Sequence, residues 1–86
     1  MEFAIVTAGH DCRQIYQVFK QDETYVYLVN GKTKTSDNPK KKSKKHIQII
    51  KNLPEEVLAI MEQNVEENHK VRKAIKCLAQ HIYRSI

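Results

Sequence analysis

The chain has 86 residues, of which 41% are hydrophobic and 29% charged, and its 15 Lys and Arg outnumber its 10 Asp and Glu to give a formal net charge of +5. This length allows one domain, or a small barrel with a helical appendage, but it excludes two independent cores and disfavours an elaborate buried active site. The positive balance suits a polyanionic partner. All of the excess lies in residues 1–52, which hold ten basic and five acidic side chains, whereas residues 53–86 hold five of each.

The two cysteines, Cys12 and Cys77, lie far apart in a sequence with no basic n-region followed by an apolar h-region. Reduced thiols in a cytoplasmic protein are therefore expected. The longest apolar stretches, such as residues 47–50, are far too short to span a bilayer, so no membrane span is expected.

The first third of the chain has the period-two pattern of short β-strands. Residues 3–8 are β-branched and apolar and end at Gly9, which predicts a strand followed by a tight turn. Residues 15–19 and 24–29 have the same character and are separated by a polar break, which predicts two further strands joined by a short acidic turn.

A hairpin and a lysine-rich segment come next. The dipeptide Asn30-Gly31 is the one that most readily forms a type I′ hairpin turn. Residues 32–35 alternate lysine and threonine, as expected of a short strand with one wet face. Residues 40–45 hold five lysines that repel one another, which indicates a loop. A fifth strand over residues 46–50 then completes a small barrel or strongly bent sheet.

Towards the C-terminus the hydrophobic period changes from two to 3.6. Asn52 is the expected cap of a helix with Pro54 and Glu55 in its first turn. A second helix is expected to begin near Glu66 or Asn68. Two short amphipathic helices in a hairpin would bury their stripes against each other or against the barrel. The stripes are Val57, Leu58, Met61 and Val65 in the first helix and Val71, Ile75, Leu78 and Ile82 in the second.

The lysine-rich loop is the strongest indication of function. Its ammonium groups would be held over one edge of the barrel, and phosphates bound there would release condensed counterions. Lys32 and Lys34, at alternate positions of the preceding strand, would extend the same positive surface. The alternative is a charged loop that only aids solubility. The loop lysines are Lys40, Lys41, Lys42, Lys44 and Lys45.

Aromatic and turn residues add weaker indications. Tyr16, Tyr25 and Tyr27 lie on expected strands, and the last two share a face by the period-two rule. If exposed, they would stack on unpaired bases, and the alternative is core or half-buried packing. His10 and Arg13 flank the first turn, where they would meet a phosphate backbone, although His10 equally suits a cap of that turn.

Neither a metal site nor a catalytic site is indicated. His10, Asp11 and Cys12 in one segment, and Cys77 with His81 in another, carry metal-ligating atoms, but neither group has a second clustered pair at zinc spacing. Cys77 is better explained as a small apolar core residue. With no glycine-rich phosphate loop and no recognisable Ser, His and Asp set, we expect no cofactor and no small-molecule substrate. A nuclease using scattered histidines is the enzymatic alternative.

Three segments resemble the KOW-domain RNA-binding proteins of Gram-positive bacteria, which are similar in turn to a KOW-containing large-subunit ribosomal protein of archaea and eukaryotes. These segments are residues 5–11 with an Ala-Gly-His-Asp turn, residues 25–32 with a Gly-Lys hairpin, and residues 38–47 with a Pro-Lys-Lys-Lys loop. The resemblance covers about residues 3–50. The helical tail, with residues 73–76, resembles the family's C-terminal extension more loosely.

The resemblance implies a mainly β fold with helices: a five-stranded SH3-like KOW barrel over residues 1–51, then a two-helix hairpin over residues 52–86 that packs on the barrel or binds a partner. It also implies a non-catalytic, ribosome-associated protein that docks on structured RNA. By position, the RNA-facing residues would be Gly9, His10, Asp11 and Arg13 in the first turn and Lys40 to Lys45 in the basic loop.

One position departs from the family's pattern. The family usually has a glycine where this sequence has Arg13, and a left-handed backbone there would cost an arginine about 1 kcal/mol or more. The first strand is also truncated. The alternative function is a protein-protein interaction module of the translation or transcription machinery, which would act through the helical hairpin.

Overall fold

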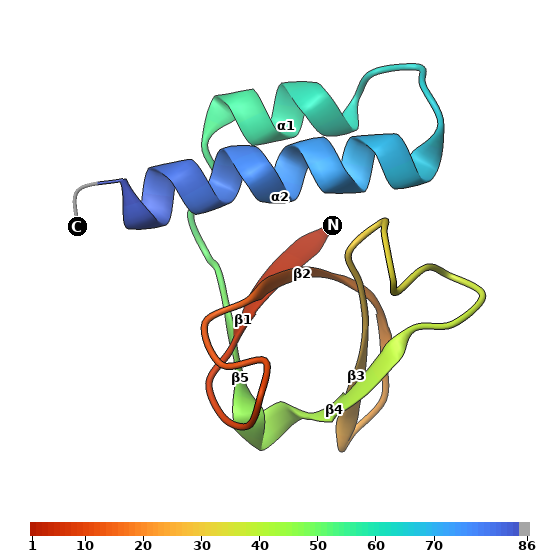
Figure 1. Ribbon diagram of the computed structural model, residues 1–86, viewed down its shortest axis with the longest axis vertical. Helices are drawn as coiled ribbons and strands as arrows, with labels where there is room; N and C mark the ends of the chain where they lie inside the picture. The colour runs from red at the N-terminus through yellow and green to blue at the C-terminus, as the bar shows by residue number, and fades with distance from the viewer. Residues whose placement is uncertain (85–86) are drawn as a thin grey trace.

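The computed structural model describes residues 1–84, so residues 85 and 86 of the expected helical segment 52–86 lie outside the described part. A curled sheet of five strands is followed by two helices that lie next to each other at one end of it (Figure 1). In chain order the elements are β1 (Glu2–Val6), β2 (Ile15–Gln21), β3 (Tyr25–Val29), β4 (Lys40–Ser43), the 3₁₀ turn η1 (Lys44–His46), β5 (Ile47–Ile49), α1 (Glu55–Met61) and α2 (Glu67–Tyr83).

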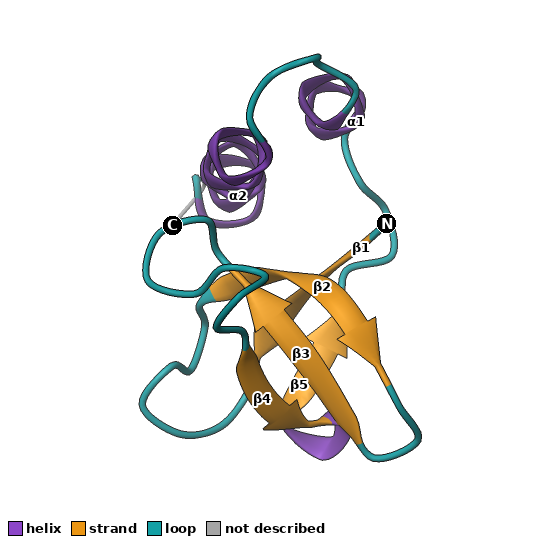
Figure 2. Ribbon diagram, turned by 90° about the vertical axis from the view of Figure 1, so that its right-hand side faces the viewer, coloured by secondary structure: helices purple, strands orange, loops and turns teal. Residues whose placement is uncertain are grey.

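The expected fold class is confirmed: a five-stranded antiparallel half-barrel carries two C-terminal helices. The strand order is β4-β3-β2-β1-β5, so β1 pairs with both β2 and β5. The two helices lie side by side over β1 and β2, and α2 is the nearer of them to the sheet (Figure 2). The Cα atoms extend over 33 × 30 × 21 Å.

Two hydrophobic clusters lie on opposite faces of β1 and β2. Successive side chains of a strand point to opposite faces, so a strand that is buried on both faces must be apolar at neighbouring positions. Phe3 and Ile15 pack against the helical residues Val57, Ala74 and Leu78. The other cluster lies inside the curl of the sheet and consists of Val6, Tyr16, Val26 and Leu28. The helices are thus held by the outer face of β1 and β2.

The first part of the lysine run is a strand and not the expected loop, and Lys44 and Lys45 follow it in the 3₁₀ turn η1. Lys40–Ser43 form β4, in which Lys40 lies opposite Leu28 and Lys42 lies opposite Val26. Alternation along a strand sends neighbouring lysines to opposite faces, which reduces the repulsion on which the loop assignment was based. The strand expected over residues 32–35 is also wrong, because no strand lies between β3 and β4 in the described chain.

Asn30 and Gly31 do not form the expected type I′ turn. Gly31 has a φ of 77°, but Asn30 is not among the described residues with a positive φ, and a type I′ turn requires two. The Asn30 side chain instead accepts hydrogen bonds from the backbone N–H groups of Lys32 and Lys34, at 2.9 and 3.0 Å. This side-chain turn begins the long connection from β3 to β4.

The helix boundaries are partly as expected. The predicted start of α2 is confirmed, because Glu66 is its N-cap and the Glu66 carboxylate accepts hydrogen bonds from the backbone of Asn68 and His69. The prediction that Asn52 caps α1 is wrong. The N-cap residue is Pro54, which makes no side-chain hydrogen bond to the helix.

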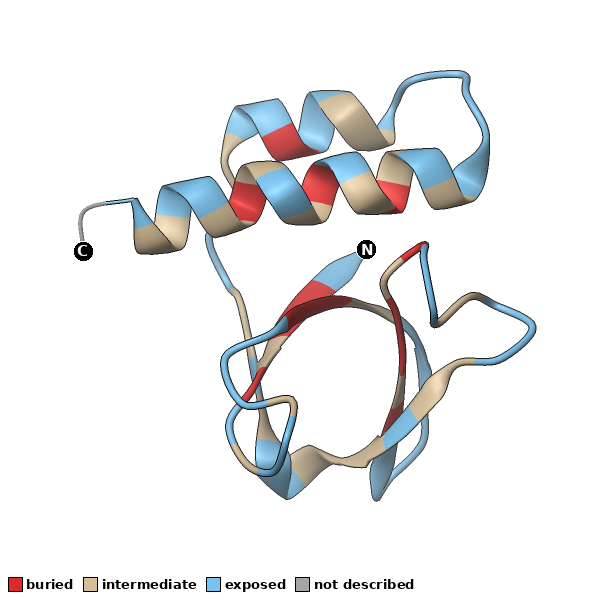
Figure 3. Ribbon diagram, viewed as in Figure 1, coloured by how far each residue is buried: buried red, intermediate tan, exposed pale blue. Residues whose placement is uncertain are grey.

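The apolar stripes are confirmed for their central residues and wrong at two positions. Val57, Val71 and Leu78 are buried, as the helical period predicts. Figure 3 shows buried segments in red on both helices. Leu58 is 38% exposed, because the short helix α1 turns only one narrow side to α2. Val65 is 45% exposed, because α1 ends at Met61 and Val65 lies in the connection to α2. Within residues 1–84, neither helix combines the length and the apolar character that crossing a bilayer requires.

Candidate nucleic-acid interface

The turn between β1 and β2, residues 7–14, contains two left-handed residues. Gly9 has a φ of 90° and Arg13 a φ of 75°. The conformation of Arg13 is fixed by its N–H, which donates a 2.7 Å hydrogen bond to the carbonyl of Val6, and by the bond from Gln14 N–H to the carbonyl of Asp11. A side chain at this φ costs about 1–2 kcal/mol relative to glycine, so the first turn carries local strain.

Tyr83 fastens this strained turn to α2. The Tyr83 hydroxyl donates a 2.7 Å hydrogen bond to the carbonyl of Arg13. The last turn of α2 and the first turn of the barrel are therefore joined, and the Arg13 side chain is placed beside the helix.

Lys40 and Lys42 close the open edge of the half-barrel. Both lie opposite apolar residues of the inner cluster, so their aliphatic stems share its face while their ammonium groups reach out toward the first turn. Lys40 Nζ lies 2.5 Å from Asp11 Oδ2, and Lys42 Nζ lies next to Gly9. The hydrogen bond from Lys40 lowers the pKa of Asp11, and the same bond raises the pKa of Lys40. These two lysines therefore have a structural role.

Lys41 points to the opposite face, which also holds the exposed Tyr25 and the half-buried Tyr27. Its ammonium group lies 4.1 Å from the ring centroid of Tyr25, and that of Lys20 lies 5.1 Å from the ring of Tyr27. The prediction that Tyr25 and Tyr27 share a face is confirmed, because they lie two residues apart on the paired strand β3. Tyr16 is different: it is buried in the inner cluster and cannot stack on a base.

The remaining predicted site residues are spread over several surfaces. Lys44 and Lys45 lie in η1 at the far end of β4, and Lys34 is half-buried in the connection from β3 to β4. His10 is exposed in the first turn. The lysines of residues 40–45 therefore do not form the single patch that the sequence suggested.

A cationic groove lies between α2 and the barrel. It has a volume of about 550 Å³, and its walls come from the first turn, the start of the β3–β4 connection and one side of α2. Among the described residues that line it there is no Asp or Glu. Its positive or titratable side chains are Arg13, Lys32, His69, Arg72, Lys73 and Lys76.

Contacts between backbone segments set the shape of this groove. Arg72 Nη1 donates a 2.6 Å hydrogen bond to the carbonyl of Gly31, which lies directly against α2. A Cβ at Gly31 would overlap the Asn68 carbonyl oxygen and Arg72, so only glycine allows this close approach. This contact brings the neighbouring Lys32 to the groove. Lys32 and Arg13, which both line the groove, are two of the site residues predicted from the sequence.

The basic side chains of α2 were missed by the sequence reasoning, which followed only the apolar stripe of that helix. His69, Arg72, Lys73 and Lys76 are spaced i, i+3, i+4 and i+7, so they occupy one side of a helix. That spacing is the signal that would have found them. None of these four side chains takes part in the ion pairs of residues 1–84, which involve Lys40, Lys70 and His81. No carboxylate of residues 1–84 therefore neutralises Arg72, Lys73 or Lys76.

Together, the fold and the groove define a small half-barrel protein with a helical hairpin and a cationic surface between the two parts. No protein-family model matches the chain, and no curated protein is significantly similar to it.

Proposed function

We propose that the protein binds RNA without catalysing a reaction, and that the RNA backbone lies in the groove between α2 and the barrel. The lining of that groove carries the proposal, because it gathers five Lys and Arg side chains and one His around a concave surface without a carboxylate among its described residues. A cleft lined by one sign of charge concentrates its field, and phosphates that enter it release counterions.

Ribosomal RNA in the cytoplasm is the proposed setting. The resemblance to KOW-domain proteins suggests RNA, and the left-handed φ of Arg13 supports it, because the family has a glycine at that position. Both cysteines are free thiols, as a reducing compartment favours.

In this proposal the groove, and not the lysine run of residues 40–45, is the main binding site for RNA phosphates. Lys40 pairs with Asp11 and Lys42 lies next to Gly9, whereas Lys41, Lys44 and Lys45 are further positive side chains outside the groove. Phosphate contacts position a nucleic acid without reading its sequence, so recognition depends on RNA shape more than on bases.

Two matched triple variants test this assignment. Lys32→Gln, Lys73→Gln and Lys76→Gln together remove three exposed charges from the groove, and Lys41→Gln, Lys44→Gln and Lys45→Gln remove three from β4 and η1. Binding to a fluorescent ribosomal RNA fragment is measured by anisotropy over a range of salt concentrations. The groove variant is expected to bind at least about tenfold more weakly, and its slope of log K against log salt is expected to be less steep by about 2–3.

The β4 variant is the control, and it is expected to retain most of the affinity. A larger loss in the β4 variant than in the groove variant would move the interface to β4. If wild-type protein binds neither the RNA nor a DNA strand of the same sequence at low salt, the nucleic-acid proposal fails.

A protein-interaction function through the helical hairpin is the second candidate. The observation that favours it is the exposure of Leu58 and Val65, two apolar side chains on the outer part of the hairpin. If Leu58→Ser with Val65→Ser abolishes association with ribosomal subunits in sedimentation while RNA affinity is unchanged, the hairpin binds a protein partner.

A further inference from the structure

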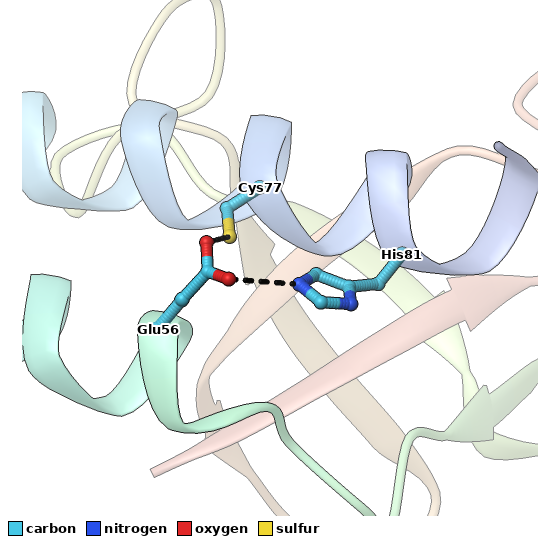
Figure 4. A group of neighbouring side chains, drawn as sticks. All are labelled: Glu56, Cys77 and His81. Carbon is cyan, nitrogen blue, oxygen red and sulfur yellow. Dashed lines mark hydrogen bonds and ion pairs between the residues drawn. The ribbon is translucent and has the colours of Figure 1, made fainter.

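Three metal-ligating side chains meet where α1 lies beside α2. Glu56 extends from α1 toward Cys77 and His81, which lie one turn apart on α2 (Figure 4). One ligand atom from each residue lies within 4.8 Å of the other two. Cys77 Sγ lies 3.6 Å from Glu56 Oε2, and His81 Nε2 lies 3.7 Å from Glu56 Oε1. A thiol, an imidazole and a carboxylate are therefore gathered at one point.

These separations are close to the edges of a zinc coordination tetrahedron. Zn–S bonds of about 2.3 Å and Zn–O or Zn–N bonds of about 2.0–2.2 Å at tetrahedral angles give ligand separations of about 3.6 Å for sulfur to oxygen and about 3.4 Å for nitrogen to oxygen. The two observed distances are within a few tenths of an ångström of these values, but they reach different oxygens of the Glu56 carboxylate, and one ligand atom from each residue lies within 4.8 Å of the other two. Coordination through one oxygen therefore requires the exposed Glu56 side chain to rotate.

The packing of the hairpin holds the three ligands in place. Residues four apart on a helix share a side, which sets Cys77 and His81 beside each other. The neighbours of two ligands, Val57 and Leu78, are fully or almost fully buried and fix the rotation of both helices. The ligand cluster is therefore supported by the core that joins the helices to β1 and β2.

A nucleophilic cysteine is the rival interpretation of this cluster, and the local charges oppose it. Burial raises the pKa of the Cys77 thiol, and the hydrogen bond to the Glu56 carboxylate raises it further. Reactive cysteines need the opposite shift, because the thiolate is the nucleophile. A bound cation would instead stabilise the thiolate and the carboxylate together.

We propose that Glu56, Cys77 and His81 bind one Zn²⁺ ion, with water in the fourth position, and that the ion clamps α1 onto α2. Thiolate and imidazole ligands select zinc over magnesium or calcium, which prefer oxygen. The clamp has a clear structural purpose, because α1 has seven residues and Val57 is its one buried side chain. So short a helix depends on tertiary contacts for its stability.

Cobalt binding to the full, reduced protein tests the site directly. Co²⁺ is expected to bind with a stoichiometry of one per chain and to give a thiolate-to-cobalt charge-transfer band together with the intense visible bands of tetrahedral cobalt. Added Zn²⁺ is expected to remove both signals and to raise the Tm in the absence of cobalt, because a ligand that binds only the folded state stabilises it.

Variants separate this site from other metal-binding groups of the chain. Cys77→Ser is expected to abolish the charge-transfer band, and His81→Asn and Glu56→Gln are expected to weaken cobalt binding at least tenfold. The matched controls are Cys12→Ser and His69→Asn, which remove the other cysteine and another histidine of α2 and are expected to bind cobalt as wild type does.

The outcomes are distinct. The His81 side chain is 35% exposed and lies outside the buried core, so its variant is expected to fold, and circular dichroism checks this for every protein. A folded wild-type protein without the charge-transfer band overturns the proposal, as does a band that Cys12→Ser removes and Cys77→Ser does not. RNA binding plays no part in these measurements, so the result is independent of the function proposed above.

Discussion

The hydroxyl of Tyr83 donates a hydrogen bond to the backbone carbonyl of Arg13, which lies 70 positions earlier in the chain, with 2.7 Å between the two oxygens. The bond joins the last turn of α2 to the left-handed residue of the first turn. Both residues also line the cationic groove. The docking of the helical hairpin and the shape of the groove therefore depend on the same contact.

Removing this hydroxyl is expected to loosen α2 from the barrel. Tyr83→Phe keeps the ring but deletes the donor, and the loss of one hydrogen bond costs about 0.5–1.5 kcal/mol. For a domain of this size, a change of 1 kcal/mol lowers the Tm by about 4–8 °C. Tyr27→Phe is the control, because its hydroxyl makes only a long 3.4 Å contact with Asp22 on the exposed face. Equal melting temperatures for the two variants would show that the Tyr83 bond contributes nothing.

Replacing the left-handed arginine is expected to stabilise the protein. Arg13→Gly removes the steric penalty of a φ of 75°, while the greater freedom of glycine in the unfolded chain offsets part of the gain. The expected net effect is about 1 kcal/mol, measured by urea unfolding. Arg13→Ala is the comparison, because it removes the same charge but keeps the strained φ. If Arg13→Ala stabilises the protein as much as Arg13→Gly, the effect comes from the charge and not from the backbone.

Two leucines on neighbouring helices are expected to respond very differently to the same substitution. Leu78 is 1% exposed in the cluster between the helices and the sheet, whereas Leu58 is 38% exposed. Leu78→Ala is expected to cost about 2–5 kcal/mol through lost burial and a cavity. Leu58→Ala is expected to stay within about 1 kcal/mol of wild type. Chemical unfolding of the two variants measures both losses of stability. Losses of similar size would contradict the packing of the hairpin on β1 and β2 through Leu78.

The ion pair of Lys40 with Asp11 predicts how stability depends on pH. The pKa of Asp11 is lowered from 3.8 in the folded state, so its contribution is present above that value and is lost as the pH falls through the folded pKa. The pKa of Lys40 is raised from 10.5, so its contribution is lost only as the pH rises through the folded pKa. Asp11→Asn is therefore expected to be less stable than wild type at neutral pH.

Unfolding in urea at about pH 7 and about pH 2 measures this difference. The gap between the two proteins is expected to shrink as the pH falls through the lowered folded pKa of Asp11. Asp37→Asn is the control, since it removes an exposed carboxylate that takes no part in the ion pairs of residues 1–84. A gap that is the same at both pH values would mean that the pair does not stabilise the fold.

Much of the fold followed from local patterns. Residues 3–8, 15–19 and 24–29 alternate or concentrate apolar side chains in the way of strands, and three strands are found there. The start of α2 was predictable because its N-cap, Glu66, is directly adjacent to the helix in the sequence. Burial of a central stripe residue such as Leu78 follows from the helical period. Such features depend on near neighbours in the chain, so the sequence is enough to indicate them.

The status of the lysine run was not decided by local pattern. Repulsion among like charges disfavours an isolated strand within residues 40–45, but pairing with β3 and the contact between Lys40 and Asp11 stabilise a strand at Lys40–Ser43. Both stabilising partners are distant in sequence. The propensity of the segment was therefore overruled by its tertiary surroundings.

By itself, the sequence determined the class of fold, the excess of positive charge and the positions of most strands and helices, because periodicity and composition act over a few residues. Only the tertiary structure decided which charges share a surface. The groove joins Arg13, Lys32 and the basic side of α2, and the ligand cluster joins Glu56 to Cys77 and His81. Residues so far apart in the chain meet only because the buried faces of β1, β2 and both helices allow a single way of packing them together.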